Sequence, residues 1–264
     1  MSWSDRSTGA PKPSEPPDAD VVLVVPCYNE AARLDVAAFR DHDAGSRRLA
    51  FCFVNDGSHD RTLEVLQGLC REMPGRAVVL DLQQNRGKAE AVRQGMLAAL
   101  GWGATIVGFW DADLATPLAE LPRFCEVLDE KPEVEVVIGS RVRLLGRRIE
   151  RSALRHYLGR VFATGASLTL GLPVYDTQCG AKLLRATPIA RELFATPFLT
   201  RWVFDVELLA RYERLVSGQE PPVERRIYEL PLVQWTDVAG SKVRPWDFVR
   251  SGLELVRIWR AYRK

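Results

Sequence analysis

The chain has 264 residues, of which 47% are hydrophobic and 27% charged, and its formal net charge is +2. This is the composition of an ordinary globular protein that can bury one sizeable core, so a wholly disordered or fibrous chain is excluded. A net charge this small gives no reason to expect a nucleic-acid partner, and no apolar stretch reaches the roughly 18 residues that a membrane span requires.

The cysteines and the first 19 residues give two further expectations. Five cysteines, an odd number, without a CxxC spacing predict reduced thiols in a cytosolic protein. Residues 1–19 contain four prolines among Ser, Gly and charged residues, which predicts a disordered leader. No hydrophobic signal core precedes the first apolar run. We therefore expect the folded part to begin near residue 20.

Five apolar runs in the first half of the chain are predicted to be strands. They occupy residues 21–25, 49–54, 77–80, 105–110 and 134–138. Helical patterns follow the first four runs, beginning near residues 31, 62, 89 and 117. Strands that alternate in this way with helices predict a mostly parallel, Rossmann-like α/β sheet with right-handed crossovers. In such sheets, ligands bind at the carboxyl ends of the strands.

The fourth run ends in two carboxylates one residue apart, Asp111 and Asp113. Two hard oxygen donors at this spacing suit a divalent cation, Mg²⁺ or Mn²⁺, that shares its other positions with water and substrate phosphates. The alternative is a plain strand end in which Asp113 caps the next turn. Polar residues at the neighbouring strand ends favour the metal site.

Three other strand ends carry polar groups. Tyr28 and Glu30 follow the first strand after Pro26, Asp56 follows the second, and Lys88 follows the third. The first of these turns is a natural place for the base or phosphate of a ligand, and a lysine can reach a phosphate as a point charge. Each has an ordinary alternative, because Glu30 could simply begin a helix and a Gly-Lys turn is usually solvated.

The second half of the chain is more basic. Seven arginines lie between residues 141 and 160, Arg141 and Arg155 among them. This run is either a solvated helix face or a phosphate-binding surface. Further helices are predicted for residues 161–170 and near residue 188, and a late strand for residues 229–235. Asp205 is predicted at the head of an apolar helix, where a carboxylate favours the positive end of the helix dipole.

The tail, residues 245–264, is predicted to be a basic amphipathic helix. Its apolar residues recur at steps of three and four, and arginines lie near them; the apolar stripe comprises Trp246, Val249, Leu253, Val256 and Trp259. Such a stripe either packs on its own domain or lies on an anionic lipid surface.

Eight motifs occur along the chain in an order that identifies a family. They are VVPCYNE (24–30), VNDGSHDRT (54–62), NRGKAEAV (85–92), DAD (111–113), GSR (139–141), DTQCGAKL (176–183), RWVFDVELL (201–209) and WTDVAGSK (235–242). Together they resemble the family-2 glycosyltransferases, and within these the dolichyl-phosphate β-glucosyltransferase branch. The resemblance implies a single GT-A catalytic domain over residues 20–244.

The resemblance also implies roles for individual residues. Pro26, Tyr28, Glu30 and Asp56 would surround the base and ribose of a sugar nucleotide, and Lys88 would lie near the nucleotide. Asp111 and Asp113 would hold Mg²⁺ or Mn²⁺ on the diphosphate.

Two further roles concern the acceptor. Asp205 falls where many members place a base, although a phosphate acceptor, already largely dianionic near neutrality, would need none. Arg141 and Lys242, from matching motifs, and Arg155, from the basic run, are candidates for gripping an acceptor phosphate.

The implied reaction is inverting, metal-dependent transfer of a hexose to a polyprenyl or dolichyl phosphate at the cytoplasmic face of the membrane, with UDP-glucose as the expected donor. Mannose transfer from GDP-mannose is one alternative, and transfer to a soluble hydroxyl acceptor, with Asp205 as base, is another. A third is a catalytically silent sugar-nucleotide-binding regulatory subunit. The eukaryotic branch carries an amino-terminal membrane anchor, whereas a Pro-rich leader stands here.

Overall fold

Seven strands form the central sheet of the computed structural model, which describes residues 17–43, 45–150, 153–237 and 245–262. The strands run in the order β3 (Ala77–Leu82), β2 (Leu49–Asp56), β1 (Val21–Cys27), β4 (Ile106–Trp110), β7 (Ala181–Arg185), β5 (Val136–Ser140) and β8 (Ile227–Pro231). All neighbours are parallel except β7, which is antiparallel to both β4 and β5. A small second sheet pairs β6 (Arg148–Glu150) with β9 (Gln234–Thr236) in parallel.

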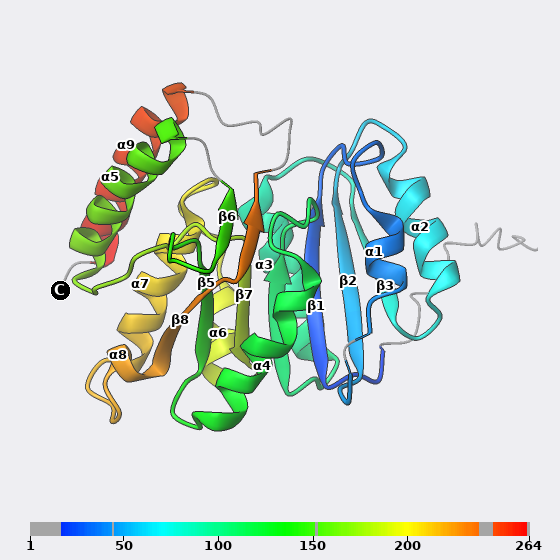
Figure 1. Ribbon diagram of the computed structural model, residues 1–264, viewed down its shortest axis with the longest axis horizontal. Coiled ribbons are helices and arrows are strands. Elements are labelled where there is room, and N and C mark those ends of the chain that lie inside the picture. The colour runs from blue at the N-terminus through cyan, green and yellow to red at the C-terminus, as the bar shows by residue number, and fades with distance from the viewer. Residues whose placement is uncertain (1–16, 44, 151–152, 238–244, 263–264) are drawn as a thin grey trace, which may run out of the picture.

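Helices cover both faces of the sheet (Figure 1). One face packs against α1 (Val36–Arg40), α2 (Thr62–Glu72) and α4 (Leu121–Glu130), which follows the 3-10 turn η1 (Leu118–Glu120). The other packs against α3 (Lys88–Gly101), α6 (Pro188–Ala195) and α7 (Phe204–Val216). The short helix α8 (Val223–Arg226) leads into β8.

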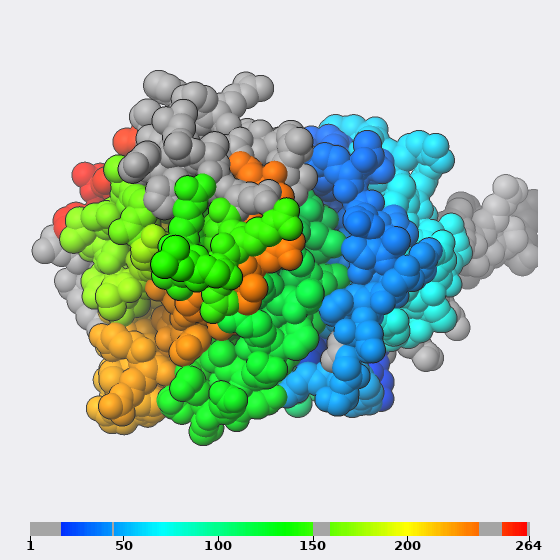
Figure 2. Space-filling model, in the orientation of Figure 1, coloured from blue at the N-terminus to red at the C-terminus, as the bar shows by residue number. Residues whose placement is uncertain are grey.

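Alternate residues of each buried strand supply the two cores. In β1, Val22 and Val24 belong to the core on the α3 side, whereas Val21, Leu23 and Val25 belong to the opposite core. Because both faces are covered, the strand is apolar throughout, as buried parallel strands are. Figure 2 shows the first and second halves of the chain in continuous contact on the visible face of the molecule.

Two long helices, α5 (Ala153–Leu170) and α9 (Pro245–Tyr262), lie side by side at one end of the molecule (Figure 1). The helix predicted for the tail is therefore present, but three residues of its predicted stripe are exposed, and the side chains of the other two, Trp246 and Val249, lie outside the described part of the chain. Leu253, Val256 and Trp259 are 70%, 46% and 39% exposed. A different stripe of α9 is buried instead, formed by Ser251, Leu255 and Ile258. In the part of the chain that the structure describes, no helix has both the length and the apolar content to cross a bilayer.

The predicted fold class, a mostly parallel sheet flanked by helices, is confirmed, but several local predictions were wrong. No helix begins at residue 31: the carbonyl of Glu30 closes a turn by accepting from the amides of Arg33 and Leu34, and Asp35 caps α1. Residues 229–235 do not form one strand but contribute to both β8 and β9. The strands β6 and β7 were missed, because β6 lies in the arginine run and Lys182 and Arg185 interrupt the apolar pattern of β7.

Candidate active site

A pocket of about 650 Å³ opens beyond the carboxyl ends of β1, β2 and β4. It collects nine residues predicted from the sequence: Pro26, Tyr28, Glu30, Asp56, Lys88, Asp111, Asp113, Arg141 and Asp205. Parallel strands bring their carboxyl ends to one edge of the sheet, so residues that are far apart in the chain meet there. Two further candidates are not placed: the side chain of Arg155 and the whole of Lys242 lie outside the described residues.

The aspartate pair occupies the turn that follows β4. The amide of Asp111 donates to the carbonyl of Gly180, 2.9 Å away. The Oδ1 atom of Asp113 accepts from the amide of Ala115 at 3.1 Å, so Asp113 does cap its own turn while it also lines the pocket. The Nζ atom of Lys88, from the start of α3, lies 2.5 Å from Oδ1 of Asp111.

Opposite charges lie close together around Asp111 and Asp113 and shift the pKa values of their neighbours. Burial raises the pKa of Asp113, and the neighbouring negative charge of Asp111 raises it further. For Lys88, burial alone would lower the pKa, but the carboxylates of Asp111 and Asp205 outweigh it, so the pKa is raised and the ammonium stays charged. A nearby cation stabilises the charged form of two carboxylates that lie this close together.

The donor set fits a hard divalent cation. Carboxylate oxygens are the ligands that Mg²⁺ and Mn²⁺ prefer. Within the described residues, no group of three or more His, Cys, Asp or Glu side chains forms a complete protein cage. A cation bound by Asp111 and Asp113 would therefore need water or phosphate oxygens to complete its coordination, as is common for Mg²⁺.

Asp56 organises the turn that positions Lys88. Its two carboxylate oxygens accept from the amides of Arg86 and Gly87 at 2.7 and 2.8 Å. Burial raises the pKa of Asp56, although these two hydrogen bonds oppose the effect. The NRGK turn is thus fixed to the end of β2, and α3 begins at Lys88 with its side chain beside Asp111.

Asp205 lies in the first turn of α7, as predicted, and pairs with a residue that we did not single out. The Nζ atom of Lys182, on β7, lies 2.6 Å from Oδ1 of Asp205 and donates to the carbonyl of Cys179 at 2.7 Å. Lys182 is 0% exposed. A buried ammonium needs such a partner, because an unpaired charge in the interior is costly. One oxygen of Asp205 is therefore committed to this ion pair.

Arg141 is also engaged within the protein. Its Nε and Nη2 atoms donate to the two carboxylate oxygens of Asp176, each at 2.7 Å, and its backbone amide donates to Oδ2 at 3.0 Å. The guanidinium also lies over the ring of Trp235, 5.4 Å from its centroid. This two-pronged pairing fixes the end of β5 to the segment around Asp176, while Arg141 also lines the pocket.

Comparison with known proteins decides the family. The sequence model described as glycosyl transferase family 2 matches residues 22–191. This chain belongs to glycosyl transferase family 2. Among its relatives, the dolichyl-phosphate beta-glucosyltransferase of Drosophila melanogaster is 35% identical, over 96% of this chain and 78% of its own length. The mouse protein of the same name is 33% identical, over 93% and 76%.

Solved structures agree on the fold of this family member. Glucosyl-3-phosphoglycerate synthase from Mycobacterium tuberculosis, in complex with Mn²⁺, UDP and glucosyl-3-phosphoglycerate, matches with a TM-score of 0.64. The match covers 93% of this chain and 80% of that one at 19% sequence identity. The same synthase with Mn²⁺ and UDP-glucose matches with a TM-score of 0.63. The chain thus has the GT-A fold that the sequence predicted.

The structure of this glycosyltransferase adds cations and aromatic rings that sequence reasoning did not assign to the site. Arg160, Arg201 and Arg250 line the pocket together with Tyr175 and Trp202. Arg160 stacks on Tyr175, with its guanidinium carbon 4.2 Å from the ring centroid. The sequence signals were the basicity of residues 141–160 and of the tail, and the motif RWVFDVELL (201–209), which begins with Arg201 and Trp202. None of these signals tells which side chain turns toward the pocket.

Proposed function

We propose that this chain is an inverting glucosyltransferase that moves glucose from UDP-glucose to dolichyl phosphate or a related polyprenyl phosphate. Relatives of that name span most of the chain, those of Drosophila melanogaster, Dictyostelium discoideum and mouse covering 96%, 89% and 93% of it. The single observation that carries the proposal is the arrangement of Asp111, Asp113 and Lys88 in the family's pocket. These intact, clustered groups argue against a catalytically silent subunit.

The residues around Asp111 account for the donor half of the proposed reaction. Asp111 and Asp113 would hold Mg²⁺ or Mn²⁺, which when bound supplies positive charge to the departing diphosphate. Lys88, whose Nζ atom lies 2.5 Å from Oδ1 of Asp111, would share that task. Asp56 acts through Lys88, because it fixes the turn from which the lysine projects.

On the acceptor side, the residues of the pocket favour a phosphate acceptor over a hydroxyl acceptor. A phosphate monoester is largely dianionic near neutral pH, its second pKa being about 6, so it attacks without a protein base. Asp205, the candidate base, is already engaged by Lys182. Arg160 and Arg250 of the pocket would bind the acceptor phosphate, together with Arg141. Arg155 and Lys242 remain candidates for the same role.

A lipid acceptor requires the protein to reach a membrane surface. The exposed faces of α5 and α9 carry large apolar side chains, namely Val161, Leu168, Leu253, Val256 and Trp259. Arg160, Arg250, Arg257 and Arg260 are exposed on the same two helices. Apolar residues flanked by arginine suit the interface of an anionic membrane. We infer peripheral binding at the cytoplasmic face, with the pocket beside the lipid head groups.

A transfer assay tests the function. With Mn²⁺ or Mg²⁺ present, radiolabelled glucose from UDP-glucose should appear on polyprenyl phosphate and not on the matching polyprenol. Asp113→Asn should lower kcat/KM by at least ~10²-fold, because it removes a metal-binding charge at nearly constant volume. Asp129→Asn, which changes an exposed carboxylate paired with Arg47, is the matched control and should be as active as wild type.

Other outcomes would redirect the assignment. Transfer from GDP-mannose but not from UDP-glucose would change the donor, and transfer to polyprenol would restore Asp205 as a base. If no sugar nucleotide binds the protein in the presence of Mn²⁺, as measured by calorimetry, the enzymatic proposal is wrong.

A further inference from the structure

A loop between α6 and α7 forms part of the pocket wall. We call residues 199–203 the pocket loop, because Arg201 and Trp202 line the pocket. Both side chains are exposed, whereas Thr200 and Val203 beside them are buried. The loop is neither helix nor strand, so its position depends on the groups that bind its backbone.

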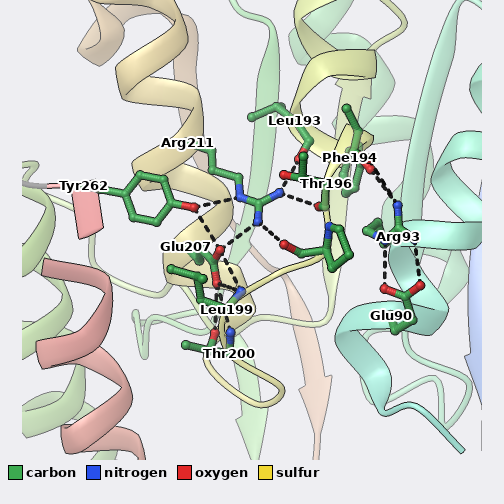
Figure 3. A network of polar contacts seen from close by, with 12 residues as sticks. Glu90, Arg93, Leu193, Phe194, Thr196, Leu199, Thr200, Glu207, Arg211 and Tyr262 are labelled. Atoms are coloured by element: carbon green, nitrogen blue, oxygen red, sulfur yellow. Dashed lines mark hydrogen bonds and ion pairs between the residues drawn. The ribbon is translucent and has the colours of Figure 1, made fainter. Parts of the chain in front are cut away.

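Glu207, a carboxylate of α7 that is 0% exposed, binds the start of the pocket loop. Its oxygens accept from the amide of Leu199 at 2.9 and 3.0 Å, from the amide of Thr200 at 3.1 Å and from the hydroxyl of Thr200 at 3.3 Å (Figure 3). Arg211, one turn later, donates to Glu207 at 2.8 Å. A buried carboxylate is stable only when it is paired and hydrogen-bonded in this way.

Arg211 also holds the chain that leads into the pocket loop. Its guanidinium donates to the carbonyls of Leu193, Thr196 and Pro197 at 3.0, 2.8 and 2.6 Å (Figure 3). Arg93, on α3, donates to the carbonyl of Phe194 at 3.2 Å. The segment before the loop is therefore tied both to α7 and to the helix that begins at Lys88.

The C-terminal helix completes this network at two points. The hydroxyl of Tyr262, in the last turn of α9, donates to Oε1 of Glu207 at 3.0 Å and accepts from Nε of Arg211 at 3.1 Å (Figure 3). Two turns earlier, Oε2 of Glu254 accepts from the amide of Val203, the last residue of the loop, at 3.1 Å. The same helix supplies Arg250 and Ser251 to the pocket.

We propose that α9 is a latch that sets the position of the pocket loop, with Tyr262 and Glu254 as its positioning residues. Different groups hold the two ends of the loop. Glu207, which is itself hydrogen-bonded by Tyr262, binds the start of the loop, and Glu254 binds its last residue. The inner face of α9 thus fixes the pocket while its outer face carries the exposed apolar residues and arginines. This inference rests on the proposed function only for the identity of the substrates that the loop faces.

Removing the Tyr262 hydroxyl tests the contribution of α9 to the position of the pocket loop. In Tyr262→Phe, Glu207 loses a donor and Arg211 loses an acceptor, while the ring and its packing remain. Loss of a hydrogen bond to a charged group should raise the open population of the loop about tenfold. Trypsin cleavage of the Arg201–Trp202 bond in the folded, full-length protein, followed by mass spectrometry, should then be about tenfold faster than in wild type, because cleavage tracks the open population.

Tyr212→Phe is the matched control. The Tyr212 hydroxyl donates to Oε2 of Glu135 at 2.9 Å, so the same substitution breaks the same kind of bond in α7 but in another network. It should lower Tm by a similar amount and leave cleavage at Arg201 unchanged. Glu254→Ala, which frees the other end of the loop, should also accelerate cleavage at Arg201.

Kinetics separate positioning from general destabilisation. Tyr262→Phe should lower kcat/KM for glucose transfer and, because Arg201 lies against the turn of Asn85 and Gly87, should also weaken binding of UDP with Mn²⁺, whereas Tyr212→Phe should change neither. Cleavage at Arg201 that is no faster in Tyr262→Phe than in Tyr212→Phe would overturn the latch. A tenfold difference in cleavage in a protein that transfers no glucose would support the latch and overturn the proposed function instead.

Discussion

The position of the Asp111 carboxylate depends on Gly180, a residue with no side chain. A Cβ atom built on Gly180 would lie 1.9 Å from Oδ2 and 2.2 Å from Cγ of Asp111. The carbonyl of Gly180 also accepts the Asp111 amide. Glycine at this position therefore lets the Asp111 carboxylate occupy the space beside β7 from which it meets Lys88. Sequence reasoning identified the carboxylates but not the space that they need.

Gly180→Ala should move the Asp111 carboxylate away from its present position, because the added methyl group and the carboxylate cannot occupy the same place. We expect kcat/KM to fall by about 10²-fold, as for loss of a group that stabilises transition-state charge. Mn²⁺-dependent binding of UDP, measured by calorimetry, should weaken in parallel.

Gly101→Ala provides the control, since a Cβ at Gly101 would meet nothing within 4 Å. Undiminished Mn²⁺-dependent binding in Gly180→Ala would show that Asp111 does not hold the cation from its present position.

At the scale of elements, α3 links the core of the sheet to the site. It begins at Lys88 and crosses over β1 and β2. A Cβ on Gly95 would lie 2.3 Å from Cγ1 of Val24 and 2.8 Å from Cγ2 of Val54. The helix can approach both strands this closely only because residue 95 is glycine. This close packing fixes the helix on the sheet and, with it, the position of Lys88 at its first turn.

Gly95→Ala should therefore destabilise the protein although alanine favours helix. Overpacking of a tight core typically costs about 1–3 kcal/mol. Gly101→Ala, on the same helix, should be neutral or gain up to about 1 kcal/mol from helix propensity. Urea unfolding of the three proteins measures both effects. A Gly95→Ala protein as stable as wild type would mean that α3 can shift away from the sheet without loss.

The helix α9 shows that one amphipathic sequence can carry two apolar stripes. Leu253, Val256 and Trp259 of the predicted stripe are exposed, whereas Leu255 and Ile258 are buried. A Cβ on Gly165 of α5 would lie 3.4 Å from Cδ1 of Leu255, so the two helices pack closely there. The exposed apolar residues of both helices, Val161 and Leu168 of α5 among them, therefore lie at the same end of the molecule.

At the scale of the whole molecule, the net charge of +2 conceals an uneven distribution. The helix α5 contains no acidic residue. Among the α9 side chains that the structure describes, the single carboxylate, Glu254, turns inward to Val203. The end of the molecule formed by α5 and α9 thus combines exposed apolar side chains with exposed arginines.

This asymmetry predicts selective binding to vesicles. The protein should co-sediment with vesicles that contain phosphatidylserine and much less with pure phosphatidylcholine, and added salt should weaken the binding because exposed charges are screened. The double variant Leu253→Ser, Trp259→Ser should bind several-fold more weakly, since it removes apolar area that would enter the interface.

The exposed Val233 lies on another part of the surface, and Val233→Ser is the control. Equal binding of wild type and the double variant would rule out this face of α9 as the membrane contact.

Local sequence patterns were enough to predict the mostly parallel α/β class, the aspartate pair at the end of β4 and the family. Alternating strands and helices, and polar residues placed just after apolar runs, are local patterns that a chain shows without folding. The tertiary structure decided which charges meet: Lys182 and Asp205 are 23 residues apart, Arg141 and Asp176 are 35, and Glu207 and Tyr262 are 55. It also decided that β7 runs antiparallel and which stripe of α9 is buried. These outcomes depend on which elements become neighbours, because burial and ion pairing act through space between segments that no local pattern connects.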